Sequence, residues 1–80
     1  MREQILERDN YCCQISLQKG RIVSEKGLHV HHIIPISQNW DLRLEPTNLI
    51  TLSSEMHSAV HNGLYSNIDL QKLVDSKYDK

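Results

Sequence analysis

The apolar residues of this chain lie in short groups, and their spacing predicts short strands and helices. Residues 28–34 are rich in strand formers, and Pro35 ends the run because it lacks the N–H that a strand ladder needs. Residues 49–52 form a second apolar run. Residues 36–47 between them have no regular period, which predicts a long loop. We therefore expect a hairpin whose two strands are joined by a long connection.

A helix is predicted directly after the second strand, over about residues 54–62. Ser53, or the serine that follows it, is a suitable N-cap, and Gly63 is a natural stop. The apolar stripe of this helix consists of Met56, Ala59 and Val60. At about 100° per residue, His57 and His61 point roughly 120° away from the centre of that stripe. The helix can thus bury one flank while both histidines face a neighbouring cleft.

Helices are also predicted at both ends of the chain. Residues 2–9 are rich in helix formers and carry Ile5 and Leu6 on one side. The last helix begins after Ser66 or Asn67, either of which can cap it. Its apolar positions, at helical spacing, are Leu70, Leu73, Val74 and Tyr78. We expect this last helix to cover the hairpin.

The segment between the first helix and the hairpin has weaker signals. Residues 11–15 are a weak strand candidate. Residues 21–23 are bracketed by turn signals at 19–20 and 25–27, which indicates short strands and loop. With no repeat or linker-like stretch, the whole pattern predicts a small α+β fold in which residues 1–80 make a single domain.

An 80-residue chain is a small domain that needs additional stabilisation. Such a domain buries only about 60% of the surface that its unfolded chain exposes. The chain has two cysteines, Cys12 and Cys13, and adjacent cysteines are poorly placed to bond each other. A metal ion held by histidines is the simplest supplement to propose, because metal binding adds directly to the free energy of folding.

The charge balance is close to neutral. The chain has nine Lys and Arg and ten Asp and Glu, and this net charge near zero argues mildly against a protein that binds nucleic acid. A bound divalent cation would add local positive charge and weaken that objection. No apolar run is long enough to span a bilayer, and the N-terminus lacks the apolar core of a signal peptide. We therefore expect a soluble cytoplasmic protein with no membrane partner.

All five histidines of the chain lie between His29 and His61. His57 and His61 are four residues apart on the predicted helix, so both rings can converge on one ion. His31 and His32 are neighbours on the predicted strand and should point to opposite faces. The simplest division of work makes one of them a metal ligand and the other a base that deprotonates water.

These residues resemble a known motif. His31-His32-Ile33-Ile34-Pro35, then Asn48-Leu49-Ile50-Thr51-Leu52, then His57 and His61, look like the motif of the HNH endonucleases, whose fold is the ββα-metal finger. The preceding residues 8–15 also resemble the lead-in of phage and bacterial members. The resemblance spans about residues 7–61, with a motif core of about 28–62.

The resemblance implies a role for each residue of the motif. His31 and His57 would be metal ligands, and His61 an additional ligand for one divalent ion, Mg, Mn, Ni or Zn. His32 would be the general base, and Asn48 would tie the long loop so that the base keeps its orientation. His29 is then most simply an exposed polar strand residue.

The same resemblance implies a metal-dependent endonuclease that hydrolyses phosphodiester bonds of DNA, by nicking or by cutting both strands. The expected partner is a DNA substrate, with a DNA-binding partner or a further segment available to supply specificity. Arg43, in the long loop, is the candidate DNA contact. Trp40 in the same loop has two candidate roles, to stack on a base or to plug the edge of the core, and we expect the core role because a loop tryptophan in so small a domain more often has it.

The chain departs from many members of the family in one respect. Where they hold a structural zinc with four cysteines, this chain has Cys13, Ser16, Ser53 and Met56. We therefore expect no zinc ribbon. Cys12 and Cys13 are then predicted to be small apolar residues of a strand.

One alternative function stays open. The histidines could hold a structural zinc in a non-catalytic module that binds DNA or protein. Closed four-ligand sites are structural and open three-ligand sites are catalytic. The two readings therefore differ in whether His32 ligates the ion or stands away from it.

Overall fold

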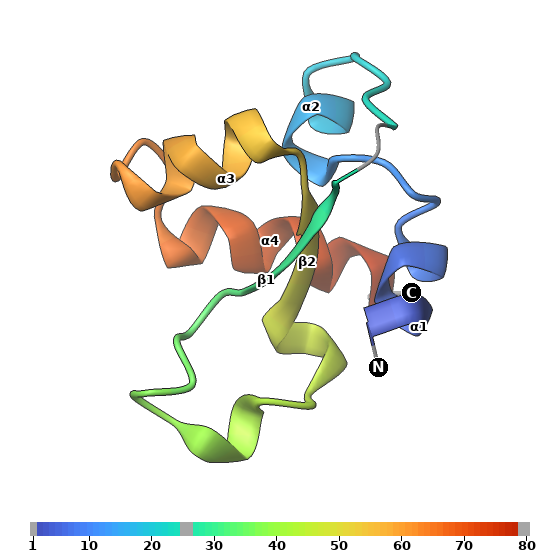
Figure 1. The fold of residues 1–80 in the computed structure, drawn as a ribbon. Coiled ribbons are helices and arrows are strands. Elements are labelled where there is room, and N and C mark those ends of the chain that lie inside the picture. Colours follow the sequence, from blue (N-terminus) through green and yellow to red (C-terminus); the bar gives the residue numbers. More distant parts are fainter. Residues whose placement is uncertain (1, 25–26, 79–80) are drawn as a thin grey trace.

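The computed structural model describes residues 2–24 and 27–78. In chain order its elements are α1 (Arg2–Arg8), α2 (Gln14–Gln18), β1 (His29–His32), η1 (Trp40–Leu42), η2 (Pro46–Asn48), β2 (Leu49–Leu52), α3 (Ser54–His61) and α4 (Asn67–Tyr78) (Figure 1). A two-stranded hairpin is followed by a helix, and further helices flank this unit on both sides of the sequence. The α+β fold predicted from the sequence is confirmed.

The hairpin is antiparallel, with His29 opposite Leu52 at its open end. At the loop end the Ile33 N–H donates to the Asn48 carbonyl at 2.8 Å, which extends the pairing one residue beyond β1. The next N–H, that of Ile34, donates instead to the Asn48 side-chain oxygen at 2.8 Å. The regular strand is therefore shorter than the predicted 28–34, because a side chain replaces the neighbouring strand as the hydrogen-bond partner.

Helix α3 begins and ends where the sequence predicts. The Ser53 hydroxyl accepts a hydrogen bond from the Met56 N–H at 3.2 Å, and Gly63 with φ +79° follows its end. Ser53 and Met56 occupy two of the positions at which a zinc ribbon would need cysteine. One is the helix cap, and the other packs into the core. The main core consists of Cys13, Ile15, Ile33, Ile50, Leu52, Met56, Leu70 and Val74.

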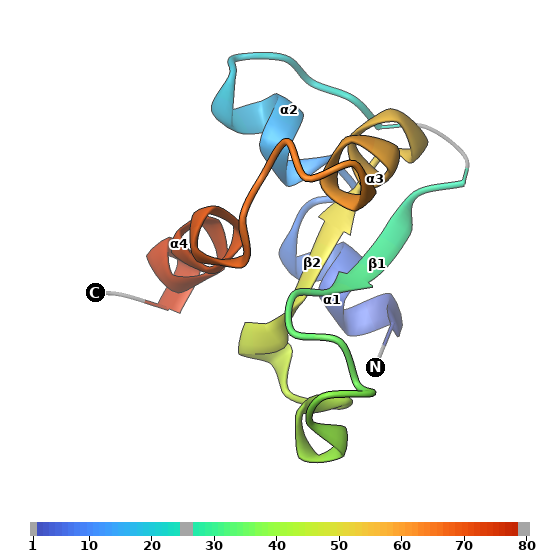
Figure 2. The same cartoon turned by 90° about the vertical axis from the view of Figure 1, so that its left-hand side faces the viewer.

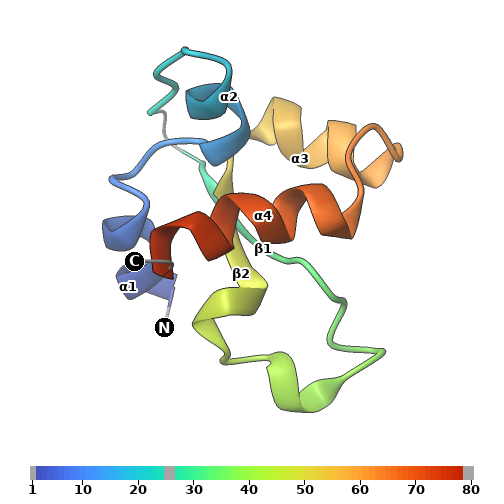
Figure 3. The ribbon, with the colours of Figure 1, turned by 180° about the vertical axis from the view of Figure 1, so that it is seen from behind.

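Helix α4 packs against β2, and β1 lies on the opposite side of that strand, as Figures 2 and 3 show. Leu70 and Val74 are fully buried in the same core as Ile50 of β2. The helix is capped reciprocally: the Asp69 N–H donates to the Ser66 hydroxyl at 3.1 Å, and the Ser66 N–H donates to the Asp69 carboxylate at 3.2 Å. Leu70, Leu73 and Val74 thus pack where the sequence predicts, whereas Tyr78 is 48% exposed and its hydroxyl accepts a hydrogen bond from Arg8.

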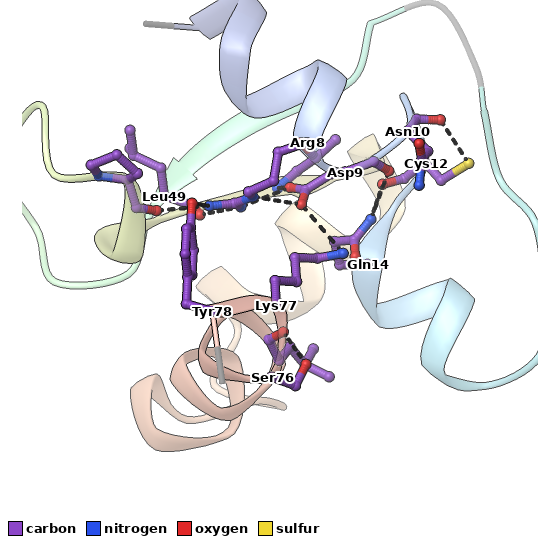
Figure 4. A network of polar contacts seen from close by, with 12 residues as sticks. Arg8, Asp9, Asn10, Cys12, Gln14, Leu49, Ser76, Lys77 and Tyr78 are labelled. Atoms are coloured by element: carbon purple, nitrogen blue, oxygen red, sulfur yellow. Dashed lines mark hydrogen bonds and ion pairs between the residues drawn. The ribbon is translucent and has the colours of Figure 1, made fainter. Parts of the chain in front are cut away.

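A buried ion pair joins α1 to β2 (Figure 4). Asp9 is fully buried, and its two carboxylate oxygens each accept a 2.9 Å hydrogen bond from Arg8. One of them also accepts from the Thr51 N–H at 3.0 Å. Arg8 in turn donates to the carbonyls of Leu49 at 2.7 Å and Pro46 at 2.8 Å. The pair therefore fixes the start of β2 against the N-terminal helix.

The strand predicted at residues 11–15 is wrong. Asn10 and Tyr11 have φ of 57° and 53°, so the chain turns sharply here, and α2 begins at Gln14. The buried Gln14 side chain donates to the carbonyls of Asp9 and Cys12, both at 2.9 Å. These local hydrogen bonds favour a turn and helix over an extended strand.

The expected strand content of residues 21–23 is also absent within the described range, where these residues form no regular strand. Val23 contributes one backbone link, because its carbonyl accepts the Cys13 N–H at 2.9 Å. Cys13 is fully buried as expected of a small apolar residue, but it stands before α2 and not in a strand. The turn predicted at 25–27 lies partly outside the described residues.

Candidate active site

Three histidine rings meet between β1 and α3. The centroid of His31 lies 5.4 Å from that of His57 and 6.1 Å from that of His61. The two helical rings are 4.5 Å apart, and their Nε2 atoms are separated by 3.3 Å. The spacing of four residues in α3 and the outward face of β1 thus bring all three imidazoles together.

The two rings of α3 are spaced like two ligands of one metal ion, whereas His31 is farther away. Two nitrogens bound tetrahedrally at about 2.0–2.1 Å lie about 3.4 Å apart, and their ring centroids about 5.2 Å apart. The 3.3 Å between the Nε2 atoms of His57 and His61 matches such an edge. The centroid distances of 4.5, 5.4 and 6.1 Å scatter around the expected value. As placed, no three His, Cys, Asp or Glu side chains among the described residues form a complete ligand set. His31 must therefore move closer to His61 to complete one.

The local environment favours the neutral form of His31 and His57. Burial first, and then the charges of the neighbouring His57, His61 and His32, lower the pKa of His31 to about 4. The pKa of His57 is also lowered, by burial first and then by His29 and His61. A neutral imidazole has a free lone pair for a metal ion, so these two side chains can ligate at neutral pH without losing a proton first.

His29 is closer to this group than a simple surface residue would be. It is exposed, as expected, yet its ring stacks on His57 with centroids 4.5 Å apart and planes 11° apart. Its Nε2 lies 3.4 Å from the Ser54 hydroxyl. The alternation of a strand places residues 29 and 31 on one face, which is the sequence signal for this contact. A ring that stacks parallel to a neighbour supports its orientation.

His32 is separate from the three-ring group. Its Nε2 lies 3.1 Å from the carbonyl oxygen of Arg43 in the long loop. Because a carbonyl can only accept a hydrogen bond, Nε2 must carry the proton and donate it. The lone pair of the neutral ring is then on Nδ1. The contact with Arg43 therefore selects one tautomer and leaves one nitrogen able to take a proton.

Asn48 holds the long loop at its base. The side chain is only 3% exposed and bonds to the backbone of Ile34 in both directions. Its Oδ1 accepts from the Ile34 N–H at 2.8 Å, and its Nδ2 donates to the Ile34 carbonyl at 3.1 Å. Nδ2 also lies 3.4 Å from the Leu42 carbonyl, one residue before Arg43. Asn48 thus fixes both ends of the loop next to the residue that contacts His32.

An open cleft of about 330 Å³ gives access to these side chains. It is lined by Val30, His31, His32, Pro35, Ile36, Ser37, His57 and His61. None of these described lining residues carries a carboxylate, so the cleft does not repel a phosphate. Residues from β1, the start of the long loop and α3 therefore share one accessible surface.

Trp40 and Arg43 contact each other at the tip of the long loop between β1 and β2. The prediction that Trp40 plugs the core is wrong, because its side chain is 61% exposed. The Arg43 guanidinium lies 4.6 Å from the centre of the indole ring and donates to the Trp40 carbonyl at 3.1 Å. The core in this region is filled by the hairpin residues and α4, which leaves the loop tip outside it.

A comparison with protein families identifies the fold. A family model described as HNH endonuclease matches residues 12–63, well over half of the chain. The chain belongs to the HNH endonuclease family. The matched segment contains β1, the long loop, β2 and α3, so the hairpin and helix correspond to the ββα-metal fold. No curated protein and no solved structure matches the chain significantly.

Membership of the HNH family has general consequences. It indicates a nuclease hydrolase with a DNA substrate, and HNH nucleases typically use a divalent metal ion. All the side chains described above, from His29 to His61, lie within the segment matched by the family model. Among the residues that the structure describes, no helix is long and apolar enough to cross a membrane.

Proposed function

We propose that this HNH protein is a metal-dependent endonuclease that hydrolyses DNA phosphodiester bonds with His32 as general base. The observation that carries the proposal is the separation of two groups of histidines. His31, His57 and His61 gather on one side, whereas His32 is held by the Arg43 carbonyl at 3.1 Å. An open three-ligand site with a base beside it is a catalytic arrangement.

His32 would remove the proton from the attacking water. Nε2 is engaged by the loop, so Nδ1 is the nitrogen that accepts the proton, and an imidazole is well matched to proton abstraction at neutral pH. The Arg43 carbonyl keeps the neutral ring in this tautomer before the proton is taken, and it can stabilise the imidazolium that then forms. The resulting cleavage would leave a 5′-phosphate and a 3′-hydroxyl.

His31, His57 and His61 are the residues that would hold the ion. The 3.3 Å separation of the two helical Nε2 atoms and the neutral state of His31 support this assignment. The ion, when bound, supplies positive charge at the scissile phosphate and at the leaving oxygen. Imidazole ligands favour Mn, Ni or Zn, and an open site that keeps waters can also use Mg.

Asn48 is proposed as a positioning residue. Its three contacts with the backbone of Ile34 and Leu42 fix the loop that contains Arg43. Arg43 is proposed to contact DNA with its side chain while its carbonyl holds His32. The whole loop between β1 and β2 would therefore hold the general base in a fixed position relative to the substrate.

A plasmid cleavage assay tests the proposed function. Wild-type protein with Mg, Mn, Ni or Zn should convert supercoiled plasmid to nicked or linear forms, and EDTA should stop the reaction. His32→Ala should reduce the rate at least about 100-fold, and added imidazole should restore part of it. Ile22→Ala changes an exposed residue that does not line the cleft and is the matched control.

Two outcomes would count against the proposal. Equal rates for wild type and His32→Ala would remove His32 from the role of base. A wild-type protein that binds zinc and DNA but cuts with none of the four metals would instead support a non-catalytic zinc module.

A further inference from the structure

Trp40 is an exposed aromatic residue in a small domain that has few large apolar side chains. It is the only tryptophan of the chain, and 61% of its side chain is accessible. Burying a tryptophan removes about 150–250 Å² from water, so leaving it at the surface forgoes a large stabilisation. The long loop carries it away from the helices, at the far end of the hairpin (Figures 1 and 2).

The indole is held in place from two directions. It belongs to the short helix η1, which Asn39 caps by accepting the Asp41 N–H at 3.2 Å. Arg43 lies 4.6 Å from the ring centre and donates to the Trp40 carbonyl at 3.1 Å. We call this pair of side chains the Trp40–Arg43 platform. An aromatic ring ordered by a stacked guanidinium is the kind of surface on which nucleobases stack.

The platform is connected directly to the candidate active site. The Arg43 carbonyl holds the His32 ring at 3.1 Å, and the preceding carbonyl, that of Leu42, lies 3.4 Å from the Asn48 side chain. Arg43 and His32 also line one hollow of about 260 Å³ on the side of β1 away from α3. A strand of DNA placed at His32 therefore lies next to a platform whose position is fixed by the same residues.

We propose that Trp40 stacks on a nucleobase of the DNA that occupies the histidine cleft, with Arg43 holding the indole in place. The inference rests on the proposed function for the identity of the substrate. The carboxylates of Asp41 and Glu45 offset the charge of Arg43, so stacking must supply most of the affinity of the loop. The contribution of Trp40 should therefore depend little on salt, unlike that of a residue that pairs with phosphate.

Fluorescence of the single tryptophan tests the proposal directly. Metal-free wild-type protein in EDTA is titrated with a short single-stranded oligonucleotide, whose base faces are free to stack, and binding of a labelled copy is followed in parallel by anisotropy. We expect tryptophan quenching that follows the anisotropy curve. Trp40→Ala should weaken binding roughly 5- to 150-fold, or about 1–3 kcal/mol, by a similar factor at low and at moderate salt. Trp40→Phe should retain most of the affinity.

A relocated tryptophan provides the matched control. In the double variant Trp40→Phe/Ile22→Trp, the reporter stands at an exposed position that lines neither the cleft nor the hollow beside Arg43, and its fluorescence should not change on DNA binding. Thermal melts should show that Trp40→Ala folds like wild type, because exposed substitutions change stability by only about 0.5 kcal/mol.

The outcomes separate this inference from the proposed function. DNA binding without quenching, or with equal affinity for wild type and Trp40→Ala, overturns the platform even if the protein cleaves plasmid. Quenching and weaker binding by Trp40→Ala support the platform even if no metal activates cleavage. Absence of DNA binding at any salt overturns the platform and leaves the loop as a surface for another partner.

Discussion

Truncation of Asn48 to alanine is expected to loosen the active-site loop before it unfolds the protein. The side chain is 3% exposed and makes contacts of 2.8, 3.1 and 3.4 Å with the backbone of Ile34 and Leu42. Its removal leaves the partly buried Ile34 N–H without its acceptor. An unsatisfied buried group costs about 1–3 kcal/mol, out of the roughly 3–5 kcal/mol that a core of this size supplies.

A loss of about 2 kcal/mol corresponds to a fall of roughly 8–16 °C in melting temperature for a domain of this length. Asn39→Ala is the matched control, because it removes a single exposed hydrogen bond from the same loop. It should change stability by less than about 1 kcal/mol. Thermal unfolding followed by circular dichroism measures both variants.

The same substitution should reduce kcat for DNA cleavage at a temperature at which the Asn48→Ala variant is still folded. The expected decrease is at least about tenfold, because the base loses its fixed position. The Nε2–H proton of His32, which is held by the Arg43 carbonyl, should lose its protected signal in proton NMR. Retention of both kcat and this signal would refute the positioning role, whatever the change in melting temperature.

Three further predictions concern stability. Asp9→Ala should cost about 3–5 kcal/mol because the partly buried Arg8 guanidinium loses its carboxylate partner. Arg8→Met/Asp9→Leu should recover only part of this loss, because the Thr51 N–H stays without its acceptor; equally stable single and double variants in urea titrations would contradict this. Metal-free protein should lose stability as pH falls from about 6.5 to 4, because His31 with its pKa of about 4 stays neutral when folded but is protonated when unfolded. After allowance for solvent screening of this partly exposed ring, the loss is about 1–2 kcal/mol, and thermal melts of His31→Gln should show a shallower pH slope. Zinc at a hundred times its Kd should add about 2.7 kcal/mol to wild type and much less to His57→Ala, and identical shifts by calorimetry would exclude His57 as a ligand.

The sequence was most informative where a local rule decides the structure. Ser53 and Gly63 mark the ends of α3, and the helical period places His57 and His61 on one face. The alternation of a strand correctly separates His31 from His32. Those features need only near neighbours along the chain, so they could be predicted without knowledge of the tertiary structure.

The features that were missed depend on contacts between distant segments. Asp9 accepts hydrogen bonds from its neighbour Arg8 and from Thr51 of β2, and its carboxylate is fully buried. Trp40 is exposed because residues of the hairpin and α4 already fill the core, which no period in the loop sequence reveals. The turn at Asn10 and Tyr11 was missed for a different reason. Both residues have positive φ, an uncommon conformation that the residue type of Tyr11 does not indicate.

The anchoring of the long loop also bears on how this protein could change over evolution. Ile34 at one end, and Leu42 and Arg43 at the other, are held by Asn48 and His32. Residues inserted between these fixed ends would lengthen the loop without moving its ends. Doubling the length of a loop costs only about 0.6 kcal/mol in loop-closure free energy. Target preference could therefore diversify by insertion at positions 35–41 while the chemical groups stay in place.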